Sequence, residues 1–164
     1  MTDVIPVQAP TGLDDIIAHY GDPKFNGIMV DPAWESANMV LITDFPLVPA
    51  RRLYVHKLIV EPLRQALGDC AALGDNYRVD TIGCFAPRQK NKAAGISTHT
   101  WGIAVDINAH TNPLIVPRPA TPQFGVHYTI PDSWIDCFRR RGWMWGGDFS
   151  NRFDGMHFQL CRGY

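Results

Sequence analysis

The sequence predicts an α+β fold: a single domain in which helices flank a small, largely antiparallel sheet. Its 164 residues, of which 46% are hydrophobic, suffice for one buried core but not comfortably for two. Segments with helical and with strand-like periodicity follow one another without regular alternation, which is typical of α+β domains rather than of parallel α/β folds. No internal repeat or low-complexity run interrupts this pattern.

Two helices are expected in the first half of the chain. Residues 11–23 begin with a candidate N-cap, Thr11, and end with the stop signal GDP. A longer helix is expected from about Val55, because apolar residues recur from there at spacings of three and four. Pro62 lies inside this pattern and should kink or break the helix.

A third helix is expected over residues 132–142, capped by Asp132 or Ser133 and ended by a glycine. The domain is then organised in two parts. Residues 1–50 supply an N-terminal helix and a loop-rich extension, and residues 51–164 supply the core that carries the candidate site.

Strands are expected where the pattern becomes short, β-branched and aromatic. Residues 77–85 and 102–108 have this character, and residues 155–160 read as a closing strand. Between them, residues 109–131 hold many prolines and turn formers without helical periodicity. They are expected to form a long ordered loop, and loops of that length in a compact domain are often functional.

Composition excludes several classes of partner. The formal net charge of -1 gives no electrostatic reason to expect binding to nucleic acid or to an anionic membrane. The first residues lack the pattern of a secretory signal, and no stretch approaches the roughly 20 apolar residues of a membrane span. We therefore expect no nucleic-acid partner, no membrane insertion and a monomer that is made in the cytoplasm without a signal peptide.

The four cysteines lie far apart, and none belongs to a C-x-x-C pair. This spacing excludes a zinc ribbon and a thioredoxin-type motif. In the cytoplasm we expect buried free thiols rather than disulfides.

Two segments each pair a histidine with an aspartate. His99 and Asp106 lie in GISTHTWGIAVDIN, and Asp154 and His157 lie in FDGMHFQL. Burying two imidazoles and two carboxylates without a cation would be costly. A catalytic zinc site needs three protein ligands and one open position, which His99, Asp106 and His157 can supply, with Asp154 as proton acceptor. The other four histidines, His19, His56, His110 and His127, are expected to have ordinary structural or surface roles.

The first segment resembles a known family motif. Ser97, His99, Gly102, Ala104 and Asp106 match the S-x-H-x-x-G-x-A-x-D motif of the M15 zinc peptidases, a group of D-alanyl-D-alanine carboxypeptidases, dipeptidases and endolysins. The segment WGGDFSNRFDGMHF resembles the family's second block, an acidic residue three positions before a metal-binding histidine. The resemblance extends loosely from about residue 55 to residue 160.

The resemblance implies one zinc ion per chain, held by His99, Asp106 and His157, with Asp154 as catalytic base. It also implies the hedgehog/DD-peptidase type of α+β fold. Arg88, in GCFAPRQ, matches the position of a family arginine near the scissile bond. There a guanidinium would hold the substrate carbonyl or the developing oxyanion, and a solvated loop arginine is the alternative.

Further residues of the two blocks are candidates for substrate contact or for orienting a ligand: Ser97, Trp145 and Asp148. Trp101 and Trp143 are expected in the core or in a groove wall. Where the family often has glutamate after the final histidine and phenylalanine, this chain has Gln159, which leaves the contact made by that glutamate open.

Asp154 stands where many carboxypeptidases and dipeptidases of the family have glutamate. Aspartate there resembles the L-alanyl-D-glutamate endopeptidase branch, which includes phage endolysins. The resemblance thus implies cleavage of peptidoglycan stem peptides at the cell wall, after release or delivery of the protein. A D-Ala-D-Ala carboxypeptidase or dipeptidase is the first alternative, and a non-catalytic zinc-binding module is the second.

Overall fold

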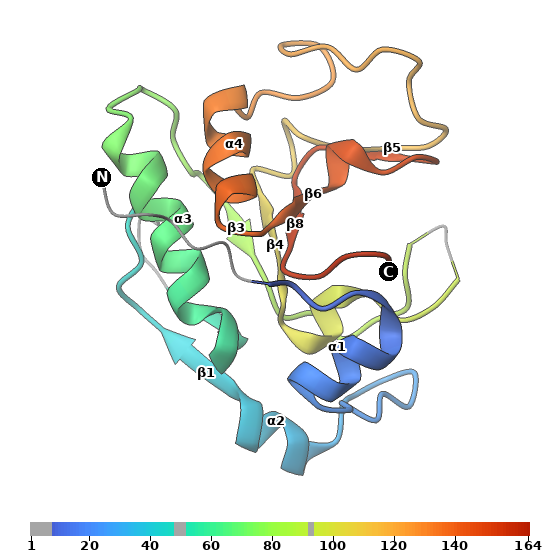
Figure 1. Cartoon of the computed structure of the whole chain (residues 1–164). Coiled ribbons are helices and arrows are strands. Elements are labelled where there is room, and N and C mark those ends of the chain that lie inside the picture. The colour runs from blue at the N-terminus through green and yellow to red at the C-terminus, as the bar shows by residue number, and fades with distance from the viewer. Residues whose placement is uncertain (1–7, 48–51, 92–93) are drawn as a thin grey trace.

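The computed structural model describes residues 8–47, 52–91 and 94–164 of the chain. At its centre lies a four-stranded sheet in the order β3–β4–β8–β6, formed by Ile82–Gly83, Ala104–Ile107, His157–Gln159 and Met144–Trp145 (Figure 1). All its pairings are antiparallel. The two central strands, β4 and β8, are almost wholly buried, so packing and strand pairing on both sides fix their positions.

Two helices lie side by side at one side of this sheet, α3 (Val60–Ala72) and α4 (Asp132–Arg140) (Figure 1). The buried face of α4 meets the sheet through Phe138, whose ring stacks on Phe158 of β8 with a centroid separation of 4.3 Å. An ion pair between Arg141 and Asp69 of α3 joins the ends of the two helices at 2.7 Å.

The N-terminal segment packs onto the opposite end of the same core. It contains α1 (Gly12–Tyr20), α2 (Pro32–Asn38) and the antiparallel pair β1 (Met39–Ile42) and β2 (Leu53–His56), followed by the 3-10 helix η1 (Lys57–Ile59). The hydroxyl of Tyr20 donates to the carbonyl oxygen of Leu160 at 2.8 Å. The segment is therefore anchored beside the closing strand of the sheet.

The long loop of residues 109–131 contains one short strand, β5 (Leu114–Ile115), which pairs with β7 (Phe153–Asp154). Asn112 fixes the rest of the loop, because its side-chain oxygen accepts the backbone N–H groups of Thr129 and Ile130. The prediction of an ordered loop is confirmed, apart from this added strand.

The strand predicted over residues 77–85 is wrong in its extent, since only Ile82–Gly83 pairs with β4. The reason lies in Asn108. Its side chain accepts the N–H groups of Asp80 and Thr81 and donates to the carbonyl oxygen of Arg78, so an amide side chain replaces a strand partner.

The helix predicted from Val55 is also wrong at its start. Residues 53–56 form β2, η1 follows, and α3 begins only at Val60. The apolar spacing continues across three elements because each faces the same core. Pro62 causes no break, because it lies in the first turn of α3. Backbone N–H groups there have no partner within the helix, so the missing N–H of proline costs no hydrogen bond.

Two caps and one helix also differ from expectation. Neither Thr11 nor a side chain at the start of α4 makes a capping hydrogen bond, and Asp132 instead accepts the Tyr128 hydroxyl. Helix α2 was not expected, although Asp31 followed by proline is a standard start: the Asp31 side chain accepts the N–H of Ala33.

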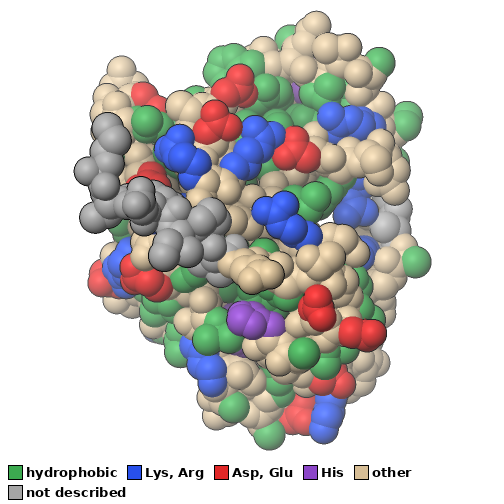
Figure 2. Space-filling view, viewed as in Figure 1, with side chains coloured by type: hydrophobic (Ala, Val, Ile, Leu, Met, Phe, Trp, Pro, Cys, Tyr) green, Lys and Arg blue, Asp and Glu red, His purple; other side chains and the backbone are tan. Residues whose placement is uncertain are grey.

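The four cysteines are buried free thiols, as expected. Across the described residues, no helix is both long and apolar enough to span a lipid bilayer. On the face shown in Figure 2, acidic and basic side chains are interspersed, in keeping with the small net charge of -1.

Candidate metal centre

His99 is presented by a short 3-10 helix, η2 (Thr98–Trp101), that precedes β4. Ser97 begins this turn, and its side-chain oxygen accepts the backbone N–H of His99 at 3.3 Å. Gly102 ends it in the left-handed conformation, with a φ of 65° that glycine adopts without strain. The imidazole Nδ1 donates to the carbonyl oxygen of Cys84 at 2.6 Å, which leaves Nε2 facing the pocket.

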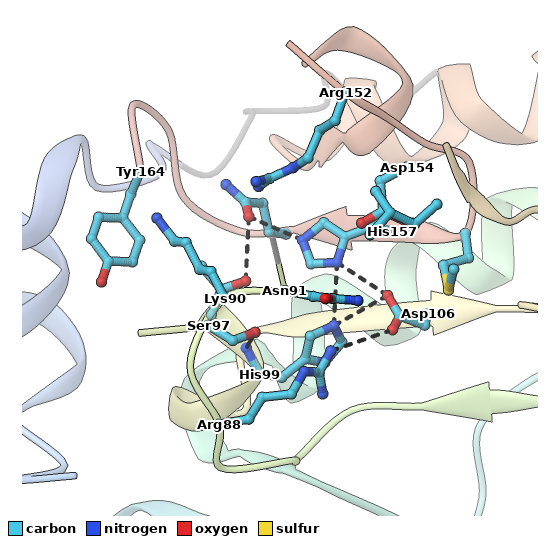
Figure 3. A pocket seen from close by; sticks show the side chains of 14 residues that line it. Arg88, Lys90, Asn91, Ser97, His99, Asp106, Arg152, Asp154, His157 and Tyr164 are labelled. Carbon is cyan, nitrogen blue, oxygen red and sulfur yellow. Dashed lines mark hydrogen bonds and ion pairs between the residues drawn. The ribbon is translucent and has the colours of Figure 1, made fainter. Parts of the chain in front are cut away.

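Asp106 and His157 lie directly opposite each other in the β4–β8 pairing, so the sheet register brings them together. The carboxylate Oδ1 of Asp106 is 3.0 Å from Nδ1 of His157 and 3.1 Å from Nε2 of His99. The two imidazole nitrogens are 3.2 Å apart. Three side chains from two distant segments thus converge on one point, as Figure 3 shows.

Gln159 fixes the orientation of the His157 ring. Its buried side-chain oxygen lies 3.0 Å from Nε2 of His157 and accepts the Thr98 hydroxyl at 3.3 Å, while its amide group donates to the carbonyl of Cys161. An amide oxygen only accepts, so Nε2 of His157 carries a proton, and in the neutral ring Nδ1 presents its lone pair to a metal ion. Gln159 therefore makes the contact that the sequence left open.

The residues present fit a divalent metal ion. Their ligand atoms form a triangle with sides of 3.0, 3.1 and 3.2 Å. Ligands placed tetrahedrally around a zinc-sized ion at about 2.0–2.1 Å are separated by about 3.3 Å, so the triangle needs little rearrangement. Each imidazole is also held through its other nitrogen, as is usual for metal-binding histidines.

The charges of the centre favour an ionised carboxylate. Burial of Asp106 acts to raise its pKa, but hydrogen bonds from His157 and His99 hold that pKa well below its usual range. Burial likewise acts to lower the pKa of His157, and the hydrogen bond and charge of Asp106 raise it. Asp106 is thus ready to bind a cation without first losing a proton.

Asp154 lines the same cavity, of about 310 Å³, and lies next to His157 in Figure 3. Its Oδ1 is buried and has no hydrogen-bond partner among the described residues. Burial raises the pKa of Asp154, the charge of His157 opposes this rise, and that of Asp106 adds to it. A buried carboxylate oxygen without a partner is suited to accept a proton from a molecule that enters the cavity.

Residues 90–160 match a family model described as D-alanyl-D-alanine carboxypeptidase, within the M15 peptidases. This segment contains the complete His99, Asp106 and His157 cluster and also Asp154. Over these residues the chain is similar to the M15 peptidase family. The match confirms the resemblance seen in the sequence motifs. The M15 peptidases are metallopeptidases. No curated protein and no solved structure gave a match.

Arg88 lies just before the matched segment and lines the cavity near His99, whereas Asp154 lies by His157 (Figure 3). Its backbone is fixed by the η2 turn: the carbonyl oxygen accepts from Ser97 and from the Thr100 hydroxyl, and the N–H donates to that hydroxyl oxygen. The guanidinium is half-exposed, with Nη2 4.0 Å from Oδ2 of Asp106. It can therefore reach a substrate oxygen at the metal centre.

Trp145 and Asp148 of the WGGD block are placed differently from each other. The buried Trp145 donates its indole N–H to the carbonyl oxygen of Gly155 at 2.9 Å, which holds the turn between Asp154 and His157. The carboxylate of Asp148 accepts two hydrogen bonds from Arg139, at 2.8 and 2.9 Å. In the described part of the chain its contact is with α4 rather than with a metal ligand.

The remaining predicted residues have structural roles. Trp101 and Trp143 are buried in the core. His56 is buried too, where Nε2 donates to the carbonyl oxygen of Tyr20 and Nδ1 accepts the N–H of Leu58. Burial is the main cause that lowers the pKa of His56 to about 4, so this histidine is neutral.

Gly146, in the 3-10 helix η3 (Gly146–Asp148), is expected to tolerate no side chain. A Cβ there would lie 2.5 Å from the carbonyl oxygen of Asp154, 2.8 Å from its Cβ and 3.0 Å from the Cβ of His157. We expect Gly146→Ala to weaken metal binding and to lower turnover by about a hundredfold, because shifts of about 1 Å have such effects. Zinc titration and peptide hydrolysis would measure both.

Gly68→Ala is the matched control, since a Cβ at that position in α3 meets no atom within 4 Å. The control should keep full activity and gain up to about 1 kcal/mol of stability, because alanine favours a helix interior. Normal zinc affinity and turnover in Gly146→Ala would show that the backbone there does not hold the site.

Among the residues that line the cavity and were not expected from the sequence are Lys90, Arg152 and Tyr164. A signal was present for two of them. Lys90 follows Arg88 by two positions and Arg152 precedes Asp154 by two, and in extended chain such neighbours share a face.

Proposed function

We propose that the protein is a zinc-dependent peptidase of the bacterial cell wall that cuts peptidoglycan stem peptides at the L-alanyl-D-glutamate bond, after release or delivery to the wall. The observation that carries this proposal is a buried carboxylate oxygen of Asp154 that has no partner among the described residues, in the cavity that holds a complete His–Asp–His set. A module that only binds zinc gains nothing from burying a further carboxylate, which costs free energy.

The ligand set supports zinc in particular. Two imidazoles and one carboxylate leave one position open on a tetrahedral ion, which is the arrangement of catalytic rather than structural zinc. Elemental analysis after extensive dialysis should find about one zinc per chain. No stoichiometric metal, together with no gain of activity on adding zinc, would contradict the assignment.

Hydrolysis would divide the work between the ion and the chain. A divalent ion held by His99, Asp106 and His157 would polarise the scissile carbonyl and acidify a water molecule. Asp154 would accept the proton of the attacking water and pass it to the leaving amine. Arg88, which lines the same cavity, would donate hydrogen bonds to the oxygen on which negative charge develops.

Arg88→Lys is expected to lower turnover while leaving zinc content and thermal stability nearly unchanged. Lysine keeps the charge but loses the two-pronged donor geometry of the guanidinium. If Arg88 meets the oxyanion, its loss should cost about 3 kcal/mol of transition-state stabilisation. Steady-state hydrolysis of a stem peptide measures this effect. Wild-type turnover in Arg88→Lys would mean that Arg88 is only a surface residue.

A second bond of the stem peptide is also a candidate for cleavage. Aspartate at position 154 favours the L-alanyl-D-glutamate bond, whereas the description of the matching family favours D-alanyl-D-alanine. Digestion of purified peptidoglycan separates the two. New D-glutamate amino termini would support the endopeptidase, released D-alanine would support the carboxypeptidase, and intact stem peptides in the presence of zinc would contradict both.

A further inference from the structure

The cavity beside the metal centre carries more positive than negative side chains. Three cations line it, Arg88, Lys90 and Arg152, against two carboxylates, Asp106 and Asp154. The carboxylate of Asp106 is already in contact with both imidazoles of the cluster. A bound divalent ion would make the excess of positive charge larger still, so the cavity favours an anionic occupant.

Lys90 and Arg152 have no acidic partner among the described residues, unlike three arginines elsewhere in the molecule. Arg64, Arg139 and Arg141 each pair with an aspartate at 3.2 Å or less. Within the described ranges, neither Lys90 nor Arg152 forms an ion pair. Their charges are therefore not neutralised by the fold.

Aromatic rings position both cations instead. Nζ of Lys90 lies 3.5 Å from the ring centroid of Tyr164, and the guanidinium carbon of Arg152 lies 4.8 Å from that of Phe149. Such contacts hold a cation over a ring face while leaving N–H donors free. Figure 3 shows Arg152 beside His157, and Lys90 beside Ser97 with its amine directed toward Tyr164.

The two cations also repel each other. Burial lowers the pKa of Lys90, and the charge of Arg152 lowers it further. Both residues line a second hollow of about 390 Å³ that adjoins the first, so they stand where the two hollows meet. An anion placed there would relieve the repulsion and would lie next to the metal centre.

We propose that Lys90 and Arg152 form a subsite that binds a free carboxylate of the peptide substrate beside the scissile bond. This inference rests on the proposed function for its substrate. Two carboxylates of a stem peptide have this chemistry: the α-carboxylate of γ-linked D-glutamate and the C-terminal carboxylate. A guanidinium and an ammonium that line the same cavity suit either of them.

Matched synthetic peptides test the subsite. One pair differs only in whether the D-glutamate α-carboxylate is free or amidated, and the other only in whether the C-terminus is free or amidated. Binding of each peptide is measured with the zinc-loaded Asp154→Asn protein, in which turnover is blocked. The same measurements are made on double variants that carry Arg152→Gln or Lys90→Gln on this background. Arg78→Gln is the control, because Arg78 is exposed and lines neither hollow.

We expect one free acid to bind more tightly than its amide, and the pair that shows this preference identifies the carboxylate. Each pocket substitution should reduce that preference by about tenfold or more, because hydrogen bonds to charged groups are strong. The neutral peptides should bind unchanged, zinc content should stay constant, and Arg78→Gln should have no effect.

The outcomes separate this inference from the proposed function. Equal binding of acids and amides, or equal weakening of both by Arg152→Gln and Lys90→Gln, would overturn the subsite, as would no binding of any peptide. A binding preference that depends on these cations, in a protein whose wild-type form cuts no stem peptide, would support the subsite and remove the proposed function. Cleavage of stem peptides without such a binding preference would support the proposed function and overturn the subsite.

Discussion

Replacing Asp154 by asparagine is expected to abolish peptide hydrolysis while the metal stays bound. Asparagine has the same shape but cannot accept a proton from water at neutral pH, and general-base catalysis contributes about 10²- to 10⁴-fold to rate. The two histidines keep their own contacts, the carbonyl of Cys84 for His99 and the side chain of Gln159 for His157. Turnover and zinc content, measured on the same preparation, test both parts.

Asp154→Glu is the matched variant, since it keeps the charge and moves the carboxylate by one methylene. The backbone of Asp154 is held close to Gly146, so the longer side chain would extend further into the cavity. We expect a loss of about a hundredfold, the size of effect that a displacement near 1 Å produces. Near-normal turnover in Asp154→Asn would show that another group accepts the proton.

The clustering of His99, Asp106 and His157 was predictable from sequence because their chemistry is unusual for their surroundings. His99 and Asp106 lie among small and apolar residues, where an unpaired charge would be costly. The sequence does not show that Asp106 stands opposite His157, since strand register depends on pairing between segments 51 positions apart. The family resemblance, rather than the local pattern, supplied that link.

Predictions failed where side chains replaced backbone partners. The segment before β3 has a strand-like pattern, but the amide of Asn108 satisfies its backbone, and only the folded chain brings that amide there. Helix α2 is a different case, because its start signal at Asp31 is local and could have been used. Lys90 and Arg152 were missed because a single cation in sequence gives no sign of lacking an acidic partner.

His157→Ala is expected to remove the metal and, unlike the Asp154 variants, to destabilise the fold. His157 lies in the centre of the buried sheet and donates to Gln159, whose side-chain oxygen would keep only the Thr98 hydroxyl as donor. The bound ion also contributes to folding free energy, because the unfolded chain has no preformed site. At a free zinc concentration 1,000 times the dissociation constant, that contribution is about 4 kcal/mol.

Thermal unfolding with and without a chelator separates these two effects. The wild-type midpoint should fall when zinc is removed, whereas that of His157→Ala should be lower from the start and insensitive to the chelator. His110→Ala is the control, because His110 is exposed and lies outside the cluster, and it should behave as the wild type does. Stoichiometric zinc in dialysed His157→Ala would show that the third ligand is another residue, and the cluster would have to be reassigned.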